Sequence, residues 1–127
     1  MIALAVSAYL VLVALLVGSF INMAADRVPR GESLIRPGSH CRACGRQLNL
    51  IDLIPVVGYL IRHGRCATCG VSIGASSPAI EAACGAAMLS SVALLGTYQG
   101  ALAGFAMVAL LGFGAVGLAA RRGSRAG

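Results

Sequence analysis

Charged side chains are missing from two long stretches of this chain, Met1–Ala25 and Ala82–Ala120. A helix needs about 20 mainly apolar residues to cross the hydrocarbon core of a bilayer, and both stretches exceed this length. Only 11% of all residues are charged and the mean hydropathy is +0.87, whereas a soluble domain carries roughly 25% charged residues. The sequence therefore predicts an integral membrane protein.

The second uncharged stretch is too long for one membrane crossing. As a single helix, Ala82–Ala120 would measure roughly 58 Å at ~1.5 Å per residue, nearly twice the ~30 Å hydrocarbon core. The polar, glycine-flanked sequence Gly96–Gly100 is the expected break. We therefore predict an all-α integral membrane fold with three transmembrane helices. The predicted segments are helices at 1–25, 78–97 and 101–120, a loop at 26–77 and a basic tail at 121–127.

The basic residues predict how the chain is oriented in the membrane. All ten are arginines, seven between Arg27 and Arg65 and three between Arg121 and Arg125. Because basic residues accumulate on the cytoplasmic side, we expect the loop and the tail in the cytoplasm and the N-terminus outside. A cleaved signal peptide would need basic residues before its apolar stretch, and none precedes the first span.

Two Cys-x2-Cys pairs carry the strongest chemical signal in the loop. Two thiolates on one tight turn can reach the same ion, and a second such turn completes a tetrahedron of sulfurs. Gly45 and Gly70 follow the second cysteine of each pair, where such a turn needs a residue that tolerates positive φ. This pattern predicts a zinc-ribbon-like module with a closed, structural zinc site. The predicted ligands are Cys41, Cys44, Cys66 and Cys69.

Other assignments of the metal-binding residues are weaker. Two disulfides are the main alternative, but disulfides persist in oxidising compartments and not in the cytoplasm. His40 and His63 lie beside the cysteine pairs and are alternative ligands, although with four cysteines present we expect both to be solvated. Cys84 falls inside the second predicted span, where it is expected to serve as a small apolar side chain.

The sequence between the two cysteine pairs is strongly apolar for a loop. Leu48–Ile61 is too short to span a membrane and is interrupted by Pro55 and Gly58. Since a soluble loop rarely exposes so much apolar surface, we expect this segment to lie on the bilayer or to pack against the spans. Membrane tethering and the absence of a basic run argue against a nucleic-acid partner.

Glycines recur at short spacing in the third predicted span. Gly112–Gly117 matches the G-x-G-x-x-G pattern of dinucleotide-binding folds, but the strand and the acidic residue which that fold requires are missing. Small residues at such spacing let membrane helices approach closely. We interpret this pattern, and Gly100-x3-Gly104, as helix-packing positions.

Several short motifs occur in order around the cysteines. They are Gly18-Ser-Phe-Ile-Asn22, Arg27-Val-Pro-Arg-Gly-Glu-Ser33, Ser39–Gly45, Asp52-Leu-Ile-Pro-Val56, Gly64–Gly70 and Pro78-Ala-Ile-Glu81. Together, from about Gly18 to Leu95, they resemble the N-terminal cysteine-rich domain of the bacterial type IV prepilin leader peptidase/N-methyltransferases. The resemblance implies a multi-pass protein of the bacterial inner membrane that acts on prepilins, or on the pseudopilins of type II secretion.

Two departures from that family bear on mechanism. The family usually has Arg-Tyr where this chain has Ser76-Ser77. Peptide cleavage in the family is assigned to two membrane-face aspartates of a second half, and no acidic residue follows Glu81 here. Aspartyl proteolysis needs two carboxylates that share one site, so we do not expect this chain to be an aspartyl peptidase on its own.

The resemblance therefore leaves three functional hypotheses. The chain is a stand-alone N-methyltransferase that uses S-adenosylmethionine, or a subunit that acts with a separate aspartyl-peptidase half, or a non-catalytic scaffold or truncated paralogue. The second is favoured, with docking through small-residue faces at Gly100, Gly104 and Gly112. Weak candidates for catalytic groups at the membrane face are Asn22, Asp26 and Glu81.

Overall fold

The computed structural model describes the backbone of residues 1–125 and the side chains of residues 1–122. Helix α1 (Ile2–Arg27) continues through the 3-10 turn η1 (Val28–Arg30) into a long loop that contains the short helix α2 (Val57–Ile61). Helices α3 (Ser76–Leu95) and α4 (Thr97–Arg125) follow. Within residues 1–125 there is no strand, only isolated β-bridges in the loop. The predicted all-α fold, with a zinc-ribbon-like loop between the first two long helices, is confirmed.

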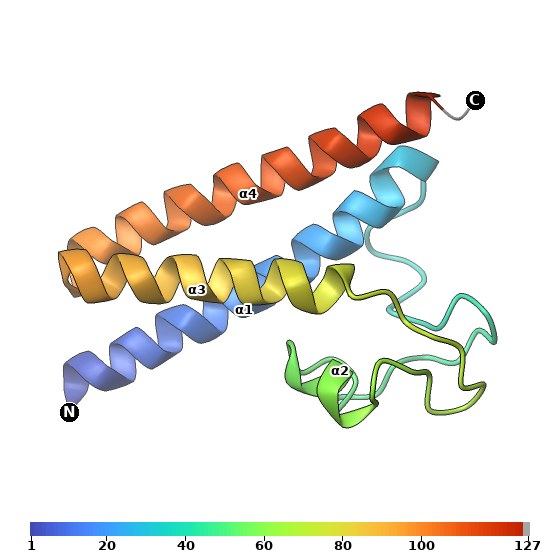
Figure 1. Ribbon diagram of the computed structural model, residues 1–127, viewed down its shortest axis with the longest axis horizontal. Coiled ribbons are helices and arrows are strands. Elements are labelled where there is room, and N and C mark those ends of the chain that lie inside the picture. The colour runs from blue at the N-terminus through green and yellow to red at the C-terminus, as the bar shows by residue number, and fades with distance from the viewer. Residues whose placement is uncertain (126–127) are drawn as a thin grey trace.

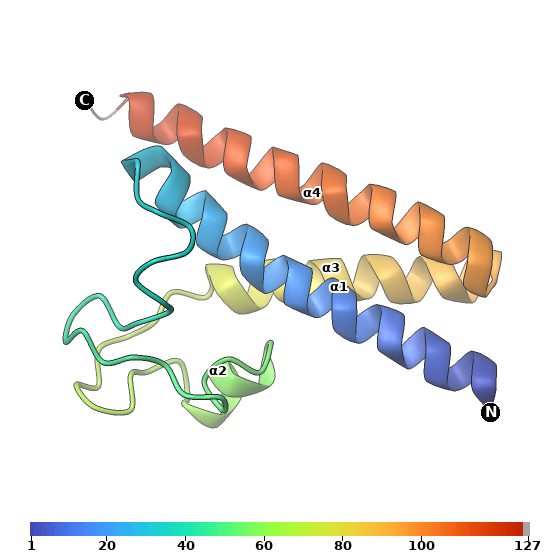
Figure 2. The same ribbon diagram turned by 180° about the vertical axis from the view of Figure 1, so that it is seen from behind.

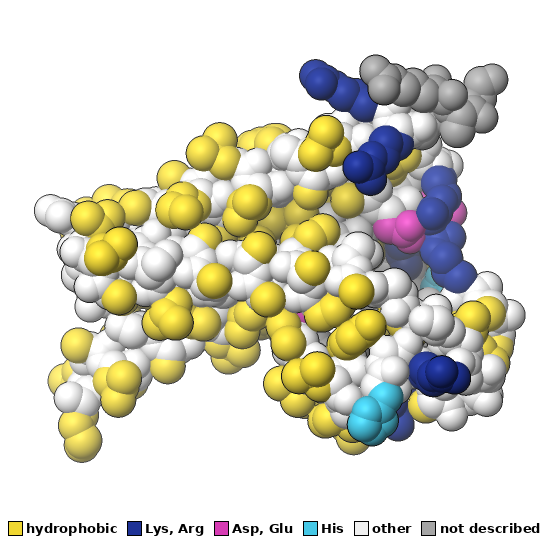
Figure 3. All heavy atoms as spheres, in the orientation of Figure 1, with side chains coloured by type: hydrophobic (Ala, Val, Ile, Leu, Met, Phe, Trp, Pro, Cys, Tyr) yellow, Lys and Arg dark blue, Asp and Glu magenta, His cyan; other side chains and the backbone are white. Residues whose placement is uncertain are grey.

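Helices α1, α3 and α4 are each long and apolar enough to cross a membrane. α3 and α4 form an antiparallel hairpin, and α1 packs across both (Figures 1 and 2). The end of α1, the start of α3 and the end of α4 therefore lie at the same end of the bundle. Charged side chains gather at this end, and apolar side chains cover the remaining length (Figure 3). Of the predicted basic tail, 121–125 continue α4, whereas 126–127 lie outside the described residues.

The break between α3 and α4 is narrower than the five-residue segment expected from the sequence. It consists of Gly96 alone, at φ 78° and ψ 172°, and α4 begins at Thr97. A side chain at Gly96 would be strained because positive φ is accessible mainly to glycine. Gly100 already lies within α4, where its N–H donates to the Gly96 carbonyl over 2.8 Å.

Small residues form the crossings between the three helices. A Cβ atom at Gly18 of α1 would lie 2.9 Å from the Glu81 Cα, and one at Gly104 of α4 would lie 2.6 Å from the Met88 sulfur. Close approach through glycine is the usual solution for membrane helices. The core that results contains Ala14, Ile21, Cys84, Met88, Val92 and Val108.

The glycines of α4 serve internal packing more than the sequence suggested. Gly100 lies against the backbone of Val92, and Gly112 against the side chain of Ile21. These positions are therefore occupied within the chain, and docking of a partner through Gly100, Gly104 and Gly112 is not compatible with this packing. At Gly114 and Gly117, a Cβ atom would have no neighbour within 4 Å.

Candidate metal centre and adjoining pocket

The two cysteine turns have the same hydrogen-bond pattern. In the first, the N–H of Cys41 donates to the Arg46 carbonyl over 2.8 Å, and the N–H of Gly45 donates to the Cys41 carbonyl over 2.8 Å. In the second, Cys66 donates to Val71 over 2.9 Å and Gly70 to Cys66 over 3.0 Å. Gly45 and Gly70 adopt φ of 72° and 67°. The positive φ predicted for both glycines is therefore confirmed.

The four cysteine sulfurs converge on one point. All four Sγ atoms lie within 4.8 Å of one another. The Cys41 and Cys69 sulfurs are 3.8 Å apart, and those of Cys44 and Cys66 are 3.9 Å apart. Sulfurs bound to one zinc at ~2.3 Å in a tetrahedron would be about 3.8 Å apart. The group could thus hold a metal ion such as zinc, and all five cysteines in the chain are free of disulfides. Neither histidine beside the turns belongs to this group.

The surroundings favour thiolates at Cys66 and Cys41, whereas burial and the neighbouring sulfurs raise the pKa of Cys69 to about 11. Backbone N–H groups of Cys69 and Thr68 lower the pKa of Cys66 to about 6, and those of Cys44 and Ala43 lower the pKa of Cys41. The guanidinium of Arg46 lies beside Asp52 and Cys66, and both raise the pKa of Arg46. Its Nε is buried and has no hydrogen-bond partner among the described residues. A divalent metal bound by four thiolates carries net negative charge. The positively charged Arg46 guanidinium, with an N–H still available beside Cys66, therefore suits such a site.

Asp52 holds together the loop between the cysteine turns. Its carboxylate accepts hydrogen bonds from Arg46 and from the Nε of Arg62, each over 2.6 Å, and from the N–H of Asn49 over 3.2 Å. The Asp52 side chain is 6% exposed. Burial alone would raise the pKa of this carboxyl, but hydrogen bonds from Arg62 and Arg46 lower it to about 2. One buried carboxylate therefore joins the segments that precede and follow α2.

Replacing Asp52 with Asn should weaken the module without changing its shape. The amide cannot neutralise Arg46 and Arg62, and loss of charged hydrogen bonds from a buried group costs about 2 kcal/mol. Because folding and metal binding are coupled, this corresponds to about thirtyfold weaker zinc binding in a chelator competition. Glu32→Gln is the matched control, since its ion pair with Arg42 is half-exposed and such pairs contribute little. Equal zinc affinities for the two variants would contradict this role.

The same carboxylate predicts a pH dependence of stability. The pKa of Asp52 falls on folding from 3.8 to about 2, so its contribution is complete above pH ~4 and is lost as the pH falls towards 2. In thermal unfolding of the zinc-loaded protein, the difference between wild type and Asp52→Asn should hold down to pH ~4 and shrink below it. A difference that persists unchanged at pH 2 would show that charge is not its source.

The first cysteine turn is fastened to the end of α1. Arg42, between the two cysteines of that turn, forms ion pairs with Asp26 and with Glu32, the latter over 3.1 Å. Arg27 is buried, and its guanidinium donates to the carbonyls of Ser33 over 2.8 Å and Gly38 over 3.3 Å. Asp26 and residues of the Arg27–Ser33 motif therefore contact the first cysteine turn and the chain that leads to it, next to the end of α1.

A second attachment joins the loop to α3. Val56 has φ 59° and ψ −50°, a strained γ-turn geometry for a β-branched residue. Its N–H donates to the Glu81 Oε2 over 2.7 Å, while the Ser77 hydroxyl donates to Oε1 over 3.0 Å. Glu81 is 5% exposed. This candidate catalytic residue therefore holds the loop in place, and the buried carboxylate explains why the strained turn persists.

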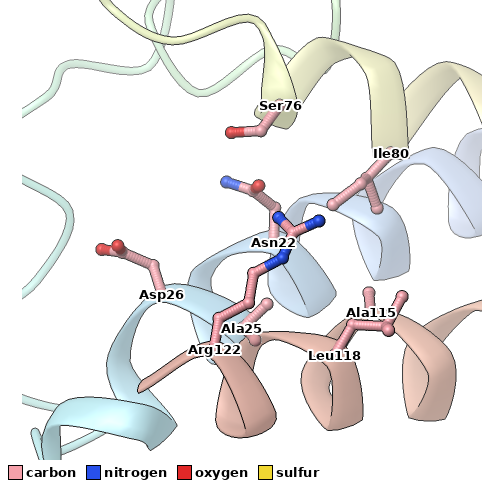
Figure 4. A pocket seen from close by; sticks show the side chains of 9 residues that line it. Asn22, Ala25, Asp26, Ser76, Ile80, Ala115, Leu118 and Arg122 are labelled. Carbon is pink, nitrogen blue, oxygen red and sulfur yellow. The ribbon is translucent and has the colours of Figure 1, made fainter. Parts of the chain in front are cut away.

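A pocket of about 320 Å³ opens between the three helix ends beside the metal module. Its polar groups come from all three helices: Asn22 and Asp26 of α1, Ser76 of α3 and Arg122 of α4. The side chains of Ile80, Ala115 and Leu118 line the opposite side (Figure 4). The pocket is thus polar towards the charged end of the bundle and apolar towards its membrane-spanning part.

The structure separates the predicted site residues into three groups. The four cysteines meet at one centre, Asn22 and Asp26 share the pocket, and Glu81 binds Val56 instead. Sequence reasoning did not connect Ser76 or Arg122 with a site. For Ser76 the sequence did hold a signal, because the family usually has Arg-Tyr where this chain has Ser76-Ser77. Nothing in the sequence indicates that Arg122 lies near α1.

Comparison with known proteins decides the family. Residues 12–95 match the family described as the bacterial peptidase A24 N-terminal domain. The chain belongs to this family. The part of α1 from residue 12 onward, all of α3, the cysteine module and two sides of the pocket fall within the matched residues.

Three proteins similar to this A24 N-terminal domain are named prepilin leader peptidase/N-methyltransferase. The Burkholderia pseudomallei protein is 33% identical over 82% of this chain and 42% of its own length. The Klebsiella pneumoniae protein is 32% identical over 81% of this chain and 48% of its own length. For the Myxococcus xanthus protein the identity is 40% over 58% of this chain and 22% of its own length.

The chain thus spans less than half the length of these curated relatives. No solved structure matches it. The family and the three apolar helices identify a protein of the bacterial inner membrane.

Proposed function

We propose that this chain is the N-terminal, methyltransferase-type half of a prepilin-processing enzyme, acting with an aspartyl-peptidase half on a separate polypeptide. The observation that carries the proposal is the pocket between the three helix ends, two sides of which come from the A24 N-terminal domain and the third from α4. Its apolar side faces the spans, so it suits a substrate whose reacting end emerges from a membrane helix. Prepilins and pseudopilins, the substrates implied by the relatives' name, are the proposed class.

Zinc has a structural part in this proposal. With Cys41, Cys44, Cys66 and Cys69 all bound, no coordination position remains for water or substrate. The ion would fold the loop and keep the end of α1 fixed through Arg42. A metal that closes a site in this way stabilises the protein instead of taking part in the reaction.

Methyl transfer in the pocket is mainly a matter of placement. S-adenosylmethionine, when bound, supplies the methyl group. The methyl group would pass to the substrate's neutral α-amine, with S-adenosylhomocysteine as the leaving group and water as the acceptor of the amine proton. We assign Asn22 and Asp26 to orienting the amine, since holding two reactants in line accounts for much of such catalysis.

The proposed orientation places the metal module and pocket on the cytoplasmic side. Charged side chains gather at one end of the bundle (Figure 3), where Arg122 lines the pocket with Asp26, and basic residues favour the cytoplasmic face. The N-terminus of α1 would then lie outside.

Transfer of labelled methyl groups tests the proposal. The purified protein, alone and with a separately expressed peptidase half, is given labelled S-adenosylmethionine and a pre-cleaved pilin peptide with a free N-terminal Phe. Label transferred only when the partner is present would establish the two-part enzyme, and transfer by the protein alone would make it an independent methyltransferase. No transfer by a zinc-loaded, folded protein in either case would overturn the proposal and favour a scaffold.

Asp26→Asn should lower the methyl-transfer rate roughly tenfold or more, since a carboxylate that orients the amine contributes through the placement of the reactants. Glu32→Gln is the control, because Glu32 binds the same arginine, Arg42, but does not line the pocket. Zinc content is measured for both variants. Equal methyl-transfer rates for the two variants, both with full zinc content, would show that Asp26 takes no part in the reaction.

A further inference from the structure

The loop between the cysteine turns exposes a continuous set of large apolar side chains around α2. Leu50 is 84% exposed, Leu60 62% and Ile61 52%. We call the exposed set the α2 platform. Its members are Leu50, Leu53, Ile54, Val57, Leu60 and Ile61. An exposed apolar group of this size marks an interaction surface.

The charged group of this segment is buried. The only charged residue between Leu48 and Ile61 is Asp52, and its carboxylate is buried against Arg46 and Arg62. Val56, whose backbone conformation is strained, donates its N–H to the Glu81 carboxylate. The charges of the segment are thus neutralised inside the loop, which leaves an uncharged outer surface.

The attachment at Glu81 fixes the depth of α2 relative to the membrane. Glu81 lies in the second turn of α3, a helix that is long and apolar enough to span the bilayer from Ser76. In both views α2 lies level with the start of α3 along the long axis of the bundle (Figures 1 and 2). Gly58 permits this compact arrangement, because a Cβ there would lie 2.6 Å from the Ile51 carbonyl oxygen.

We propose that the α2 platform inserts into the bilayer at the boundary between headgroups and acyl chains, beside α3. Its occupant is lipid, because its apolar surface continues that of the spanning helices at the same depth, and the charged side chains gather at the bundle end (Figure 3). Apolar faces of short helices bind membranes in this way. The metal module is then held to the membrane at three places: α1, α3 and the platform.

Tryptophan fluorescence tests the position of the platform, since the chain contains no tryptophan. Leu60→Trp places one reporter on the platform. Leu12→Trp, on an exposed position of α1, and Ala67→Trp, on the exposed second cysteine turn, are the membrane and solvent controls. Each full-length variant is reconstituted with zinc in phosphatidylglycerol/phosphatidylethanolamine vesicles that contain lipids brominated either high or deep along the acyl chain.

The expected result is that Leu60→Trp emits at short wavelength, is quenched most by bromine placed high on the chain, and resists acrylamide. Leu12→Trp should be quenched more by deep bromine, and Ala67→Trp by acrylamide alone. Quenching of Leu60→Trp by acrylamide as strong as that of Ala67→Trp would overturn the proposal. So would protection from both acrylamide and bromine, which would show that protein covers the platform. Zinc content measured alongside ensures that the module is folded in every variant.

Discussion

Serine in place of Cys66 should leave the protein in the membrane but without zinc. A structural zinc with four thiolates contributes roughly 10–16 kcal/mol to the folding of a small module. The four sulfurs already lie at the distances expected for tetrahedral coordination of one zinc. The hydroxyl oxygen of serine cannot replace a thiolate ligand in such a site. The loop has little core of its own, since most of its apolar side chains are exposed. We therefore expect zinc content to fall to background and the loop to become sensitive to protease, as measured by elemental analysis and limited proteolysis in membranes.

The other cysteines supply the controls for this experiment. Cys41→Ser should behave like Cys66→Ser, because both sulfurs belong to the same group. Cys84→Ser makes the same chemical change at a cysteine buried in α3, and it should keep its zinc. Full zinc content in both Cys41→Ser and Cys66→Ser would rule out a four-thiolate site. Loss of membrane insertion would contradict the view that the spans insert independently of the module.

Alanine at Gly100 should separate α3 from α4. Its Cβ would lie 2.4 Å from the Val92 Cα and 2.5 Å from the Ser91 carbonyl oxygen. Both are backbone atoms, so no side chain can move aside to relieve the contact. Overpacking of well-packed interiors costs typically 1–3 kcal/mol, and we expect about 3 kcal/mol here. The measurement is the free energy of unfolding in mixed micelles as denaturing detergent is added.

Gly114→Ala is the matched control on the same helix. No atom lies within 4 Å of the position that its Cβ would occupy, and alanine is the better helix former. This variant should be as stable as the wild type or slightly more stable. Equal destabilisation by the two substitutions would show that the α3–α4 contact is not the one described.

The sequence alone predicts the cysteine group more fully than it predicts the helix contact at Gly100. The cysteine spacing and the two glycines after it predicted the metal group, because a turn that presents two thiolates is a local structure whose requirements lie within a few residues. For Gly100 the sequence predicted close helix packing but not the partner. The partner is α3 of the same chain, since a hairpin with a one-residue turn at Gly96 forces the first turns of α4 against Val92.

Glu81 shows the limit of sequence reasoning most clearly. As an acidic residue at the start of a span it was a candidate for catalysis, yet its carboxylate accepts the N–H of Val56. The pocket that does collect polar groups takes one or two from each long helix, and Arg122 is a hundred residues from Asn22 in sequence. Neither the Glu81–Val56 hydrogen bond nor the grouping of the pocket residues can be predicted from neighbouring residues in the sequence. Both depend on how the helices are rotated about their axes.

The sequence by itself determined which segments can cross the membrane, that the loop carries four cysteines at a spacing that suits a metal ion, and which family the motifs resemble. These follow from the length of uncharged stretches, the geometry of tight turns and the order of short motifs, all of which are local. Only the tertiary structure decided which glycines meet which helix, how Asp52 and Glu81 fasten the loop, and which residues share the pocket. Those outcomes are set by side-chain packing between elements distant in sequence, where the rotation and crossing of α1, α3 and α4 fix which groups come within contact.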